Sequence, residues 1–75
     1  MVKSSINRFF IIPRREIAYI NFILESYEVI GFVTTIDRFK AIIKITISPY
    51  FIEDFEKLIE DLKKEFPIEE IEYGL

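Results

Sequence analysis

The order of apolar and polar positions divides the chain into short segments of regular structure. Residues 8–12 predict a strand that ends at Pro13, and the continuous apolar run of residues 9–12 within it indicates burial on both faces and therefore a central strand. Residues 14–28 repeat apolar side chains every three or four positions, which predicts a helix with Pro13 at its start. Residues 29–36 and 41–48 are rich in β-branched side chains and predict two further strands.

The polar segment between the last two of these strands predicts a hairpin. It contains no glycine or asparagine, which disfavours a tight two-residue turn, and Asp37 is expected to be a turn residue. A four-residue loop over residues 37–40 sets Thr34 opposite Ile43 and so collects the large apolar side chains, among them Phe32, on one face. The other face is then left to Val33, Thr35, Ile42 and Lys44.

The last third of the chain carries the clearest helical pattern. Residues 52–66 place apolar side chains on one stripe and charged ones on the other, and Pro67 ends the helix. Residues 68–73 alternate glutamates with apolar side chains, which predicts a short edge strand. The elements therefore follow the order strand–helix–strand–strand–helix–strand, in one domain over residues 1–75.

Short connections and right-handed crossovers turn this order into one fold class. We expect an α+β domain, a ferredoxin-like βαββαβ sandwich, with a four-stranded antiparallel sheet and both helices on one face. The expected strand order is fourth, first, third, second, which puts the apolar run of residues 9–12 in the middle of the sheet.

Composition and charge bear on partners. Apolar residues fill 51% of 75 positions, more than a small interior holds, so a homodimer is favoured over a monomer with scattered exposed side chains. Residues 1–52 carry a charge balance of +3 and residues 53–75 one of −6, which argues against a nucleic-acid partner.

No apolar stretch is long enough for a membrane span or a signal peptide, so we expect no membrane partner and a cytoplasmic location. Abundant Ile, Glu and Lys suit a thermophilic source.

The residue types present limit the chemistry. The chain has neither Cys nor His, and so lacks the usual transition-metal ligands and the commonest general base. No nucleophile–base pair, metal set or phosphate-binding loop can be assembled from the remaining side chains at their spacings. We therefore expect a protein that is not an enzyme and that uses no metal and no cofactor.

Three segments together resemble a known family. The segment IAYINFILESYE at residues 17–28, the segment VTTID at residues 33–37 and the acidic second helix are similar to an uncharacterised bacterial family of small single-domain proteins, domain of unknown function 4911. The resemblance covers residues 13–62. It implies an ACT-like variant of the βαββαβ fold, and ACT domains are small, usually dimeric regulatory modules that often bind amino acids. Their ligand commonly lies at a glycine in the first strand–helix junction, and Arg14 and Arg15 depart from that pattern here.

Two candidate ligand sites lie at the ends of the first predicted helix. Arg14 and Arg15 precede N–H groups that no side chain caps, which favours a phosphate or carboxylate; the alternative is two solvated arginines. Glu25, Tyr27 and Glu28 close the helix, either as contacts for a ligand amine or divalent cation or as solvated side chains.

The leading hypothesis is a non-enzymatic binding or regulatory module that works as a homodimer. The contact is expected on the sheet face away from the helices, through Val33, Ile42 and one of Phe9 and Phe10, or along the sheet edge. Tyr19 and Phe22 lie off the main helical stripe and belong either to a wide core or to a partner contact. The second hypothesis is a small-anion or amino-acid site at the first strand–helix junction.

Overall fold

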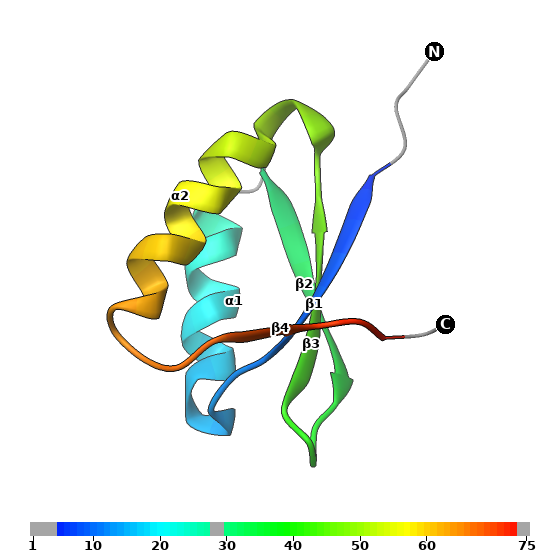
Figure 1. Ribbon diagram of the computed structural model, residues 1–75, viewed down its shortest axis with the longest axis vertical. Coiled ribbons are helices and arrows are strands. Elements are labelled where there is room, and N and C mark those ends of the chain that lie inside the picture. Colours follow the sequence, from blue (N-terminus) through cyan, green and yellow to red (C-terminus); the bar gives the residue numbers. More distant parts are fainter. Residues whose placement is uncertain (1–4, 28–29, 74–75) are drawn as a thin grey trace.

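The computed structural model describes residues 5–27 and 30–73. Its elements are β1 (Ile6–Ile11), the 3₁₀ turn η1 (Arg14–Glu16), α1 (Ile17–Ser26), β2 (Gly31–Asp37), β3 (Ile42–Ile47), the 3₁₀ turn η2 (Pro49–Phe51), α2 (Ile52–Lys63) and β4 (Glu69–Ile71). The strands form one antiparallel sheet in the order β2-β3-β1-β4. Both helices cover the same side of the sheet, which is seen nearly edge-on in Figure 1. The predicted α+β, ferredoxin-like βαββαβ fold is confirmed, including its strand order.

The core lies between the sheet and the two helices. The inner strand β3 contributes Ile43, Ile45 and Ile47, which have no exposed surface because alternate side chains of a strand point to the same face. Phe10 of β1 packs with its ring centroid 6.1 Å from that of Phe55 of α2. Burying each such side chain contributes about 1.5–3 kcal/mol. The full core cluster is Phe10, Ile12, Ile20, Leu24, Ile30, Ile43, Ile45, Ile47, Phe55, Ile59, Leu62 and Phe66.

The helices are shorter than predicted at defined points. Residues 14–16 form a 3₁₀ turn, in which the backbone N–H of Glu16 donates to the carbonyl of Pro13 at 2.8 Å, and the α-helix begins only at Ile17. The second helix ends at Lys63. The backbone N–H groups of Lys64 and Glu65 then donate to carbonyls three residues earlier instead of four. Pro67 favours this ending, because a proline disfavours α-helical backbone in the residue before it.

The β2–β3 hairpin closes one residue later than the predicted loop of residues 37–40. Asp37 pairs with Ile42 across the turn. Oδ1 of Asp37 accepts the backbone N–H groups two and three residues later, at 2.9 and 3.0 Å, so its predicted place in the turn is confirmed. Ala41 completes the turn with a left-handed φ of 58°.

The predicted register of this hairpin is therefore wrong by one residue. A bulge lies between Thr35 and Asp37, just before the turn along the chain. On the side of the bulge away from the turn, Val33 lies opposite Ile45 and Phe32 lies opposite Thr46. Because side chains alternate between faces, a shift of one residue in β2 exchanges its faces. Val33 and Thr35 thus lie on the core face, and Phe32 lies on the uncovered face with 61% of its surface exposed.

Candidate functional site

The two arginines of the predicted anion site have different surroundings. The side chain of Arg15 is 82% exposed, and its Nε lies 3.7 Å from Oε2 of Glu16. Glu16 stands at the N-cap of α1, where its negative charge already complements the positive end of the helix dipole. Arg14 instead lines a hollow between α1 and β2. Among the described residues of this junction, Arg14 therefore lines a hollow and Arg15 does not.

Of the three residues predicted at the end of the first helix, the two that the structure describes line different hollows. Glu28 lies outside the described residues. Glu25 lines a hollow beside the start of β2, together with Phe32. Tyr27 borders a different space, the groove between the two helices. Of the two residues off the helical stripe, Tyr19 packs edge-on against Phe66 and Phe22 is exposed.

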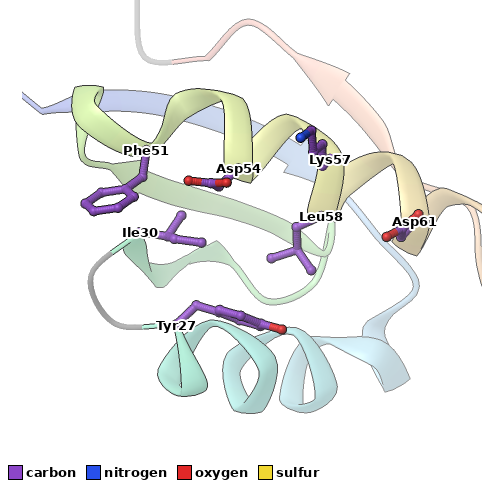
Figure 2. A pocket seen from close by; sticks show the side chains of 7 residues that line it. All are labelled: Tyr27, Ile30, Phe51, Asp54, Lys57, Leu58 and Asp61. Atoms are coloured by element: carbon purple, nitrogen blue, oxygen red, sulfur yellow. The ribbon is translucent and has the colours of Figure 1, made fainter.

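Figure 2 shows the groove between the end of α1 and α2, which we call the helix groove. Its volume of 380 Å³ lies near the lower end of the roughly 300–1,000 Å³ that is usual for small-molecule sites. Its floor is apolar, with Ile30 buried and Phe51 and Leu58 half-buried. The ring of Tyr27 lies along α1, and Leu58 points towards it from α2. An apolar group of a ligand would therefore lose water on this floor.

The rim of the helix groove is charged and comes from one face of α2. Asp54, Lys57 and Asp61 follow one another at helical spacing. Asp61 lies 3.8 Å from Nζ of Lys64, whereas Asp54 and Lys57 form no ion pair with any described residue. A free carboxylate and a free ammonium above an apolar floor can hold a zwitterion with an apolar side chain. The sequence alone reads these positions as a solvated helix face, because the floor comes from distant residues.

A second hollow, the arginine hollow, lies between η1, α1 and the β2–β3 hairpin. Its lining is Arg14, Ile17, Ala18, Asn21, Thr35 and Arg38. Sequence reasoning found Arg14 but not Arg38, because the two arginines are far apart along the chain. Only the packing of α1 beside the hairpin places them on one surface.

The sheet face away from the helices, which we call the open face, is rich in apolar side chains. Phe10 points into the core, so its neighbours Phe9 and Ile11 lie on the open face, as do their cross-strand partners Ile42 and Ile71. The ring of Tyr73 lies 5.6 Å from that of Phe9. Of the predicted contact residues, Phe9 and Ile42 are thus placed on this face, whereas Phe10 and Val33 belong to the core side.

The shortest ion pairs in the described structure join three elements of the fold. Arg8 of β1 donates from Nε and Nη2 to the two carboxylate oxygens of Glu70 in β4, both at 2.7 Å. Its Nη1 lies 3.0 Å from Oε1 of Glu56 in α2, and its guanidinium carbon lies 5.2 Å from the ring centroid of Phe55. The hydrogen bonds from Arg8 lower the pKa of Glu70, and those to Glu70 and Glu56 outweigh desolvation and raise the pKa of Arg8. Arg8 therefore fastens β1, β4 and α2 together.

Within residues 5–27 and 30–73, no group of three or more acidic, His or Cys side chains is placed to hold a metal ion. No helix in these ranges is both long and apolar enough to cross a membrane. Charged groups without an ion pair to a described residue border several hollows, among them Asp54 and Lys57 at the helix groove and Arg14 and Arg38 at the arginine hollow.

Comparison with known proteins confirms the resemblance seen in residues 17–28 and 33–37. The sequence model of a family described as Domain of unknown function (DUF4911) matches residues 10–65. The match runs from β1 to just beyond α2, and contains both the helix groove and the arginine hollow. Neither a curated protein nor a solved structure matches the chain significantly. The chain belongs to the DUF4911 family, whose members are domains of unknown function.

Proposed function

We propose that this chain is a non-enzymatic binding module that works as a homodimer, with the open face as the contact between two copies. The observation that carries the proposal is the apolar character of that face, to which all four strands contribute. Its apolar side chains are Phe9, Ile11, Phe32, Ile42, Ile71 and Tyr73. Phe32 and Tyr73 are exposed, whereas Ile42 is already buried within one copy. Several apolar side chains on one uncovered sheet face are typical of an interaction site.

The polar residues of the open face support pairing between identical copies. Lys44 lies opposite Phe9 in the middle of the sheet, and Glu69 lies opposite Ile11 on the outer strand. A two-fold axis brings the same patch from both copies together, so each lysine can meet the partner's acidic edge. The absence of His and Cys from the whole chain supports a binding role over catalysis.

Sedimentation of the intact chain tests the dimer. We expect a dimer at micromolar concentration and expect Phe32→Lys to convert it to a monomer, because a charge in a buried apolar contact loses its hydration. Phe22→Lys is the matched control, because Phe22 is exposed to a similar extent (68%) but lies on α1, away from the open face. A monomeric wild-type protein, or equal loss of dimer in both variants, would refute the open-face contact.

Binding of an apolar amino acid is the second candidate function, and the helix groove rather than the first strand–helix junction is the proposed position of this ligand. The observation in its favour is that Asp54 and Lys57 are unpaired among the described residues and stand above an apolar floor. Asp54 would accept from the ligand ammonium, and Lys57 would donate to its carboxylate.

Thermal unfolding with added leucine tests the groove. We expect saturating leucine to raise the melting temperature, because a ligand that binds only the folded state stabilises it. Asp54→Asn should abolish the rise, whereas Glu53→Gln, a neighbouring change outside the groove lining, should not. An equal rise with leucinamide, which lacks the carboxylate, would rule out the role given to Lys57.

A further inference from the structure

The arginine hollow joins two cationic segments that are distant in the sequence. Arg14 comes from η1 and Arg38 from the turn between β2 and β3, and both line the same space. In Figure 1 the start of the first helix and the tip of this hairpin lie at the same end of the molecule. The volume of 420 Å³ is in the range of small-molecule sites, roughly 300–1,000 Å³.

The donors of this hollow are uncommitted. Arg8 and Arg15 each have a carboxylate within 4 Å, but Arg14 and Arg38 have none among residues 5–27 and 30–73. The Asn21 amide and the Thr35 hydroxyl likewise have no hydrogen bond to any described residue. Two guanidinium groups, an amide and a hydroxyl are donors that suit the several oxygens of a phosphate group.

The local charge favours an anion, although the whole chain has a net charge of −3. Arg14, Arg15, Arg38 and Lys40 gather around the η1 turn and the hairpin. The acids in these two segments are Glu16 and Asp37, and both are engaged: Glu16 lies near Arg15, and Asp37 accepts two backbone N–H groups of the turn. A small anion approaching this end therefore meets excess positive charge.

We propose that the arginine hollow binds the phosphate group of a small organic phosphate. Arg14 and Arg38 hold the phosphate oxygens from two sides, and Asn21 and Thr35 add neutral donors. Ile17 and Ala18 supply apolar surface for the organic part of the ligand. The inference deepens the proposed binding role by naming a ligand class. It does not depend on the dimer, because all six lining residues come from one copy.

Chemical-shift titration of the full chain with inorganic phosphate and with phenyl phosphate tests this inference. We expect saturable shifts confined to the amides around Arg14 and Arg38, with roughly millimolar affinity for phosphate and tighter binding of phenyl phosphate. Arg14→Gln and Arg38→Gln should each weaken binding about tenfold, because each removes a charge-assisted donor. Arg15→Gln is the control; it removes the same charge outside the hollow and should change affinity by less than about twofold.

Three outcomes would overturn the inference. The first is no saturable shift with either phosphate, and the second is equal weakening of phosphate binding by all three variants. The third is binding to phosphatidylserine vesicles, used as a parallel probe, without a response to soluble phosphates. The last result would assign this basic end to a lipid surface instead. Sedimentation of the same samples separates this inference from the proposed dimer. A monomer that binds phenyl phosphate refutes only the dimer, and a dimer that does not bind it refutes only the phosphate site.

Discussion

Gly31→Ala is expected to destabilise the domain by about 3 kcal/mol or more, the range of severe backbone overlap in a packed structure. Gly31 begins β2 directly opposite Ile47 of β3. A Cβ atom on Gly31 would overlap the backbone carbonyl oxygen of Thr46 and lie 3.1 Å from Cα of Ile47. The obstacle is backbone in the inner strand of the sheet, so no side-chain rotation can relieve it.

Urea unfolding followed by circular dichroism measures this effect. Thr34→Ala is the matched control, because Thr34 is an exposed residue of the same strand and its loss should change the unfolding free energy by less than about 1 kcal/mol. If the two variants were equally stable, β2 would not approach β3 at Gly31 as closely as the structure places it. The register of the hairpin would then need revision, since Gly31 and Ile47 are one of its pairs.

Arg8→Ala is expected to cost about 2–3 kcal/mol of unfolding free energy at neutral pH, less than a fully buried ion pair because both acids are partly solvated. The change removes two hydrogen bonds to Glu70 and an ion pair with Glu56. It also removes the cation above the Phe55 ring and the apolar stem that covers the core. Arg15→Ala should leave stability within about 0.5 kcal/mol, because that side chain is largely exposed.

The same pair predicts how stability depends on pH. Arg8 lowers the pKa of Glu70 in the folded protein below its ordinary value of 4.5. The unfolded chain therefore takes up a proton at higher pH than the folded one, so the stabilisation is complete above 4.5 and is lost as the pH falls through the folded pKa. Urea unfolding of the wild type and Arg8→Ala should accordingly differ less in acid than at neutral pH. A difference that stays constant would show that packing, rather than charge, carries the effect.

Two of the candidate sites show why sequence reasoning found only part of them. Arg14 was recognisable because it follows a strand and opens a helix, a local arrangement. Arg38 carries no such signal, since its value to the hollow arises only where the hairpin meets α1. The helix groove was hidden for a related reason. In the sequence, Asp54 and Lys57 have the pattern of a solvated helix face. Only the folded chain places Tyr27 and Ile30 beside them.

Local patterns were sufficient for the elements, their order and the buried stripe of α2, because helical and strand periodicity record which side of an element avoids water. The central place of β1 also followed, from a continuous apolar run that ends at Pro13. The faces of β2 did not. They depend on the left-handed Ala41, on the Asp37 turn and on one bulge, which together move Phe32 to the open face and Val33 to the core. The alternation of side chains along one strand does not determine how that strand pairs with its neighbour. The face that each side chain takes is therefore fixed only when the strands pair. The same holds for Arg8, whose two carboxylate partners lie in α2 and β4 and meet it only in the folded protein.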